Sequence, residues 1–118
     1  MQTLQQQRAK QALAKVQGLV ELKEGDKLKS RASELPFMIH ANGLGQAAAF
    51  FRSKGNKDGY DHLYRILADW LTSQGRPYAG QDDLMAAIVK SDFHIYRAAQ
   101  AEAMQYMDWV KKFAKAYL

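Results

Sequence analysis

Cysteine is absent from this 118-residue chain, which excludes disulfide bonds and cysteine-ligated zinc sites and agrees with a reducing compartment. No run of about eighteen uncharged apolar residues occurs, so we expect no membrane-spanning helix. The opening residues, Met1 to Arg8, lack the apolar centre of a secretory signal. Together with the length, these absences predict a cytoplasmic protein whose residues 1–118 form a single domain around one hydrophobic core.

Strand patterns are lacking as well, because no stretch alternates β-branched and polar residues. Apolar residues instead recur every three or four positions, as in the segments 3–22 and 60–71. Proline occurs only twice, and Pro36 predicts a helix start or a kink. The predicted fold is all-α: a compact single-domain bundle of about five to seven helices.

Several helix starts carry residues whose side chains accept hydrogen bonds from free backbone amides. Thr3 and Gln6 fit a capping box at the first helix. Asp58 precedes the helix at 60–71, and Ser91 precedes the long final helix. We predict that each of these two side chains caps the helix that follows it.

Residues suited to catalysis or metal binding do not form a recognisable set. His40, His62 and His94 fall on three predicted helices, and none has a second ligand at metal-binding spacing. Neither a phosphate-binding glycine loop nor a serine with a histidine base is evident. Glu102 flanks the apolar seam of the last helix, where an ion pair with a neighbouring helix explains it better than general-acid catalysis. We therefore expect no enzymatic activity, no metal and no cofactor.

Positive charge is in surplus, with 17 Lys plus Arg against 12 Asp plus Glu and a net charge of +5. Such a surplus favours a polyanionic partner, although a merely basic surface is the simpler alternative. The predicted nucleic-acid-binding residues form two clusters: Arg52, Lys54 and Lys57, and then Lys111 with Lys112. Helix dipoles also favour cations at helix ends, but a third cluster at 23–31 exceeds that need. Since no aromatic-rich sheet is present to stack bases, we predict contacts to the nucleic-acid backbone without sequence readout.

Two segments carry a family resemblance. The first reads Leu35-Pro36-x-Met38-Ile39-x-x-Asn42-Gly43-Leu44-Gly45-Gln46 and continues to Ala49-Phe50 and Ser53-Lys54. The second reads Tyr96-Arg97-x-x-Gln100-x-Glu102-Ala103, followed by Trp109-Val110-Lys111-Lys112-Phe113-Ala114. Both resemble the small subunit of the type III-B (Cmr) CRISPR effector complex, an RNA-guided ribonucleoprotein of antiviral defence. Its structural motif corresponds here to Leu35, Pro36, Asn42, Gly43 and Gly45.

The glycines of this motif predict a tight junction between two helices. Glycine is unfavourable in a helix interior, so Asn42-Gly43 is expected to end one helix in a left-handed residue and to start another close by. Because no strand precedes Gly43-Leu44-Gly45, we interpret the glycines as turn and packing residues rather than as a phosphate cradle.

The resemblance implies a non-catalytic helical protein that stacks head to tail with other copies of itself. The stack would lie beside a filament of the backbone subunit, together with the large subunit, and would contact CRISPR RNA and target RNA through a basic surface. Lys54 is then the first choice for a phosphate contact. Head-to-tail stacking needs two unlike faces, for which Phe37, Met38, Met104, Met107 and Trp109 are candidates. In isolation we expect a monomer with weak self-association.

Two other functional classes remain open. The short link Lys90-Ser91-Asp92 between two helices is compatible with a small helix-turn-helix DNA-binding domain, although the following helix opens with apolar residues instead of base-reading ones. The methionines would also suit a helical protein–protein adaptor that binds no nucleic acid. Binding to RNA across a range of salt concentrations distinguishes these classes.

Overall fold

The structure is a computed structural model that describes residues 1–118 and contains six α-helices and no strand. The helices are α1 (Leu4–Leu19), α2 (Gly25–Asn42), α3 (Leu44–Ser53), α4 (Tyr60–Leu71), α5 (Leu84–Lys90) and α6 (Phe93–Tyr117), and a short 3-10 helix, η1 (Val20–Leu22), follows α1. The all-α prediction is confirmed. No helix is both long enough and apolar enough to cross a membrane.

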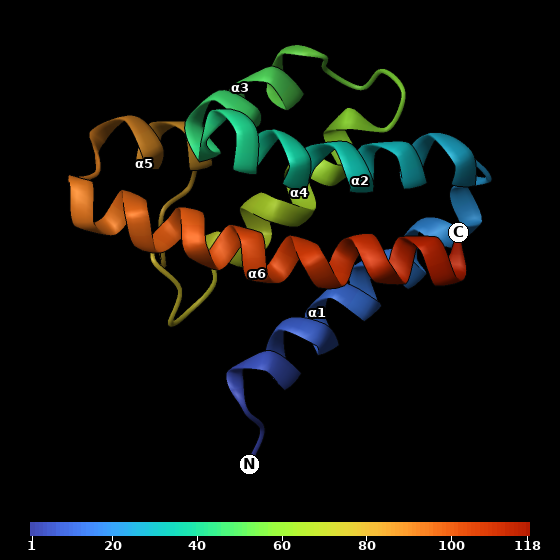
Figure 1. Cartoon of the computed structure of the whole chain (residues 1–118), viewed down its shortest axis with the longest axis horizontal. Coiled ribbons are helices and arrows are strands. Elements are labelled where there is room, and N and C mark those ends of the chain that lie inside the picture. Colours follow the sequence, from blue (N-terminus) through green and yellow to red (C-terminus); the bar gives the residue numbers. More distant parts are fainter.

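The long helix α6 organises the bundle. It packs against α1 and α2 along its length and also touches α3 and α4. Figure 1 shows α2 running beside α6 in the opposite direction and α1 crossing below them. In the same view α3 lies above the far end of α2, and α5 lies beyond that end, above the start of α6. All six helices contribute to one cluster of 27 buried apolar residues. This core holds every helix in place, so that residues distant in sequence meet around α6.

The start of α1 matches the sequence pattern. The Thr3 side chain accepts a hydrogen bond from the Gln6 amide at 3.1 Å, and the Gln6 side chain accepts one from the Thr3 amide at 2.8 Å. The predicted capping box is therefore confirmed. The helix ends through η1, and Lys23 takes the left-handed conformation (φ 58°) that separates it from α2.

Pro36 does not start a helix, which corrects that half of the sequence-based prediction, and the alternative, a kink at Pro36, stays a prediction. It lies inside α2, which runs unbroken from Gly25 to Asn42. A proline in a helix interior removes one backbone hydrogen bond and costs about 3 kcal/mol. The Pro36 ring is buried between its buried neighbours Leu35 and Ile39, and this packing against the core offsets the lost bond.

Two predicted caps are also wrong. Asp58 adopts φ 51° and pairs with Lys27 at 3.3 Å, while Gly59, at φ 83°, occupies the cap position of α4. Ser91 ends α5, where its hydroxyl donates to the Ile88 carbonyl, and Asp92 caps α6 by accepting from the Ile95 amide at 2.9 Å. Gly59 takes the cap position of α4 without a side-chain hydrogen bond, whereas the Asp92 side chain caps α6. The predicted side chains have other partners: Asp58 pairs with Lys27, and the Ser91 hydroxyl bonds to the Ile88 carbonyl and to the Tyr78 hydroxyl.

Candidate nucleic-acid interface

Gly43 forms a junction with no intervening loop between α2 and α3. Its φ of 91° and ψ of 159° lie in a region open to glycine but not to other residues. Its amide donates to the Ile39 carbonyl at 2.9 Å and so closes α2. The positive φ of Gly43 agrees with the prediction of a left-handed residue, but its ψ is extended rather than left-handed helical, and α3 starts at the next residue.

The first amides of α3 are bound by side chains of α6. The Leu44 amide donates to Gln100 Oε1 at 2.8 Å, and the Gly45 amide donates to Tyr96 Oη at 2.8 Å. A β-carbon on Gly45 would lie 3.4 Å from Tyr96 Oη and 3.5 Å from an Ile88 methyl carbon, so Gly45 is closely surrounded by α5 and α6. The two segments that carry the family resemblance therefore form one structural unit. Its amides are already occupied by protein groups, which supports a packing role for the glycines.

Glu102 forms an ion pair with a distant arginine, as the sequence predicted. Arg8 donates from Nε and Nη2 to the two carboxylate oxygens at 2.7 and 2.8 Å, and Trp70 Nε1 donates at 2.8 Å. Burial by itself would raise the pKa of Glu102, but the hydrogen bonds from Arg8 and Trp70 outweigh it and hold the pKa below its ordinary value. Glu102 is therefore a carboxylate at neutral pH and ties α1, α4 and α6 together.

Arg52, Lys54 and Lys57 lie at the end of α3 and in the following turn, and we call these three residues the basic turn. All three are exposed, and none has a carboxylate oxygen within 4.0 Å. Aromatic rings support two of them instead: Arg52 Cζ lies 5.7 Å from the Tyr64 ring centre, and Lys54 Nζ lies 4.9 Å from that of Phe50. Cation–π contacts of this kind orient a cation without neutralising it.

The other predicted cluster differs in its surroundings. Lys112 pairs with Asp108 one turn earlier on α6 at 2.8 Å, whereas Lys111 has no acidic partner and is partly buried. Figure 1 places α2 between the α3–α4 turn and the C-terminal part of α6. The structure thus leaves the two clusters apart, and only the basic turn offers three unpaired cations together.

The cations of the third cluster are mostly neutralised. Within α2, Lys27 pairs with Asp58 on the α3–α4 turn, and Lys29 and Arg31 pair with acidic residues of their own helix. Only Lys23 lacks such a partner. Pairs of exposed side chains contribute little stability, but they lower the positive potential that α2 presents.

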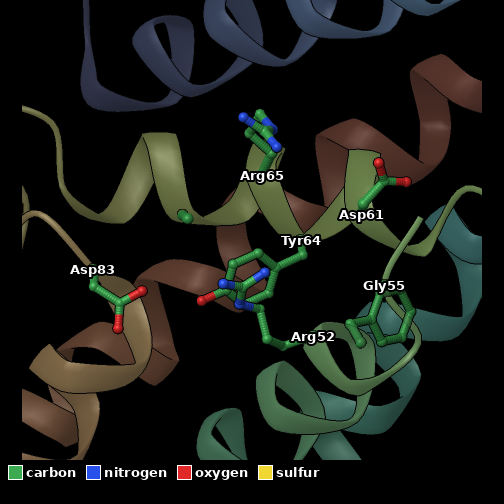
Figure 2. A pocket seen from close by; sticks show the side chains of 8 residues that line it. Arg52, Gly55, Asp61, Tyr64, Arg65 and Asp83 are labelled. Atoms are coloured by element: carbon green, nitrogen blue, oxygen red, sulfur yellow. The ribbon is translucent and has the colours of Figure 1, made fainter.

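Arg65 is a cation beside the basic turn that the sequence analysis did not name. It stands on α4 and lines, with Arg52, a hollow of about 210 Å³ beside the basic turn. Figure 2 shows both arginine side chains at this hollow, with Asp61 and Asp83 on opposite sides. Asp61 is one helical turn before Arg65, a spacing that predicts an ion pair. No such pair forms within 4.0 Å. Arg65 is therefore a fourth unpaired cation beside the three of the basic turn, although its spacing from Asp61 suggested that it would be paired.

The structure contains no cluster of potential metal ligands. No three potential ligands among His, Asp and Glu lie close enough to hold a metal ion. Of the five residues predicted for stacking faces, Phe37 is 69% exposed, Met107 is fully buried, and Met38, Met104 and Trp109 are partly buried. Prominent exposed apolar residues that the sequence analysis did not name are Val89 and Phe93, at the α5–α6 corner.

A comparison with models of protein families matches residues 4–117 to the family described as CRISPR-associated protein (Cas_Cmr5). The match covers nearly the whole chain, including the α2–α3 junction, its partners on α6 and the basic turn. The chain therefore belongs to the Cmr5 family of CRISPR-associated proteins, the small subunits of type III-B complexes.

Proposed function

We propose that this chain is a non-catalytic subunit that positions RNA in a type III-B ribonucleoprotein by binding sugar-phosphate backbone with its basic turn. The observation that carries the proposal is the set of three exposed cations, Arg52, Lys54 and Lys57, which have no acidic partner. Family membership supplies the setting, since the Cmr complex is built on RNA. Guide RNA and target RNA are the proposed ligands.

Electrostatics supports phosphate as the group bound. An ion pair partly neutralises an exposed cation, but no cation of the basic turn forms one within 4.0 Å. Aromatic neighbours hold two of these cations in place. Phosphate contacts of this type release counterions and make the affinity strongly dependent on salt, without reading sequence. Lys111 and Lys112 make at most a separate and weaker contribution, because Asp108 neutralises Lys112.

Head-to-tail stacking of copies is the second part of the proposal. Such contacts join two unlike surfaces, and the chain exposes apolar side chains on different elements: Phe37 on α2, and Val89 with Phe93 at the α5–α6 corner. These side chains are 69%, 78% and 65% exposed, whereas the apolar side chains of the core are almost completely buried. Together with the backbone and large subunits, the other copies would cover these surfaces in the assembled particle.

RNA binding by charge-matched variants tests the proposal. In one variant Arg52, Lys54 and Lys57 are each changed to Glu. In the control the same reversal is made at Lys10, Lys90 and Lys115, which are also exposed and unpaired. Both variants have the same net charge, so only the position differs. We expect the basic-turn variant to lose RNA binding and the control to keep most of it, measured by fluorescence anisotropy between about 50 and 200 mM salt.

Equal losses in both variants would show that net charge alone attracts RNA, and would contradict the proposed interface. No binding by the unchanged chain at any salt concentration would favour the second candidate, a protein–protein adaptor. The exposed apolar residues Phe37, Val89 and Phe93 are the observation in favour of that class. The structure gives less support to a DNA-binding domain, because two of the three exposed residues that open α6, Phe93 and Ile95, are apolar and only His94 is polar.

A further inference from the structure

The hollow beside the basic turn combines charges of both signs that do not pair with one another. It lies between the end of α3, the middle of α4 and the residue that caps α5, and its volume is about 210 Å³. Arg52 and Arg65 supply two guanidinium groups, and Asp61 and Asp83 supply two carboxylates. None of these four groups forms an ion pair within 4.0 Å, although all line the same small space.

Each charged group retains capacity for another hydrogen bond. Asp83 uses Oδ2 to accept from the Ala86 amide at 2.9 Å, which leaves Oδ1 without a partner. One oxygen of Asp61 is buried and accepts no hydrogen bond. The Arg52 guanidinium carbon lies 5.7 Å from the Tyr64 ring centre, and Figure 2 shows this planar group over that ring. The hollow therefore offers a flat cationic surface, further donors from Arg65, and acceptors on two sides.

We propose that this hollow receives one unstacked nucleobase of the RNA bound at the basic turn. The base would stack on the guanidinium plane of Arg52, a mode common in the recognition of single-stranded RNA. Its exocyclic amine would donate to the Asp83 carboxylate, and its ring nitrogen or carbonyl oxygen would accept from Arg65. This inference rests on the proposed function and adds to it a contact with a base.

The balance of charge favours a base over a phosphate in this hollow. Two carboxylates among the lining groups repel a bare anion, whereas the edge of a base carries donors and acceptors side by side. The size agrees as well, because 210 Å³ is smaller than the roughly 300–1,000 Å³ of pockets that bury drug-sized ligands. Cytosine and guanine combine an exocyclic amine with strong acceptors, so they fit this arrangement better than uracil, which has no amine.

The first experiment compares two ligands that carry equal numbers of phosphates: oligocytidine and a ribose-phosphate oligomer of the same length without bases. The full chain is expected to bind oligocytidine about tenfold more tightly, in line with the energy of stacking one base. Arg52→Lys keeps the charge and removes the flat platform, so it should abolish most of this difference. Arg97→Lys is the matched control, because Arg97 also lies over an aromatic ring, that of Phe93 at 5.3 Å, but outside the hollow.

The second experiment changes the acceptor and keeps the helix cap. Asn caps a helix about as well as Asp, so Asp83→Asn should leave α5 intact while it removes the carboxylate. We expect the preference for oligocytidine over oligouridine to fall about fivefold. Asp92→Asn, at the corresponding cap of α6, is expected to leave that preference unchanged. Circular dichroism confirms that both variants retain their helices.

Three outcomes separate this inference from the proposed function. Salt-dependent RNA binding that is equal for oligocytidine and the baseless oligomer, or unaffected by Arg52→Lys, would overturn the base pocket and leave the phosphate interface standing. No RNA binding at all would overturn both. The third outcome is that cytidine monophosphate displaces bound oligocytidine, at concentrations comparable to those of oligocytidine, and that ribose 5-phosphate does not. This outcome would support the base pocket and show that it also accepts a free nucleotide.

Discussion

The inward-facing polar residues of α6 and the cations of the basic turn represent two different uses of polar side chains in one small bundle. Tyr96, Gln100 and Glu102 all bond to groups on other helices at 2.7–2.8 Å. The cations of the basic turn have no carboxylate within 4.0 Å and face the surface. Satisfied polar groups stabilise a fold, whereas exposed and unpaired charges remain available to a partner.

We expect the largest loss of stability when the ion pair of Glu102 is removed. Replacing Glu102 with Ala leaves Arg8 charged and 12% exposed without its partner, which we expect to lower the free energy of unfolding by about 3–5 kcal/mol. Urea denaturation measures this loss. The matched control is Asp69→Ala, which removes the partner of Lys15 in an exposed pair and should cost no more than about 1 kcal/mol. Similar losses in the two variants would contradict the distinction between inward and exposed pairs.

The same carboxylate predicts how stability depends on pH. The pKa of Glu102 is lowered in the folded state, so its stabilising contribution is present above the unfolded-state pKa of about 4.3 and is lost as pH falls through the folded-state pKa. The stability difference between the unchanged chain and Glu102→Gln should therefore shrink below about pH 4. Urea denaturation at a series of pH values measures it. A difference that stays constant down to the lowest pH would show that the Glu102 charge is not involved.

A somewhat smaller loss is predicted at the α2–α3 junction. Gly43→Ala places a side chain at φ 91°, and we expect a cost of about 1–3 kcal/mol. The control, Gly18→Ala, changes a glycine inside α1 that has open space around it. That change should be neutral or should stabilise the protein by up to about 1 kcal/mol. Thermal unfolding measures both changes: the midpoint should fall for Gly43→Ala and should stay the same or rise for Gly18→Ala. A fall in both variants would contradict the prediction.

Removing one inward hydroxyl should have a still smaller effect. Tyr96→Phe deletes the acceptor of the Gly45 amide, which we expect to cost about 1–2 kcal/mol because that amide is left without a partner. Tyr117→Phe is the control, since Tyr117 is 52% exposed. Amide hydrogen exchange at Gly45 provides a local measurement and should become faster only in Tyr96→Phe. Unchanged protection at Gly45 would show that this hydrogen bond does not form in solution.

The smallest change in stability is expected at the basic turn. Lys57→Ala should alter the free energy of unfolding by less than about 0.5 kcal/mol, because it removes an exposed side chain without a partner. It should nevertheless reduce the slope of log affinity for single-stranded RNA against log salt concentration by about 0.7, the value for one lost phosphate contact. If Lys57→Ala lost stability but kept the full salt slope, Lys57 would contribute to the fold rather than to RNA binding, contrary to this prediction.

Periodicity and glycine chemistry were sufficient to predict much of this protein. The all-α fold, the capping box at Thr3, the positive-φ turn at Gly43 and the ionic role of Glu102 all follow from local patterns. Each depends on interactions within a few residues or on a simple preference for pairing buried charge. The match to the Cmr5 family agrees with the two segments that suggested it.

Other features depended on contacts between distant residues. The sequence required a cation for Glu102 but did not identify Arg8, which lies 94 positions away. Pro36 breaks helices by its local chemistry, yet core packing keeps it within α2. The pairing of charged residues was likewise not readable from spacing, because Lys112 finds Asp108 at four residues whereas Arg65 does not pair with Asp61 at the same separation.

Local sequence thus established which segments are helical, where the chain turns and how much positive charge it carries, because these properties arise from backbone preferences and composition. Tertiary packing alone decided which cations remain unpaired, that Arg52 and Arg65 share a hollow, and that α6 supplies the partners for the first amides of α3. The physical reason is that electrostatic pairing depends on distance in space, and in a bundle of six helices that distance is set by side-chain packing across the whole core.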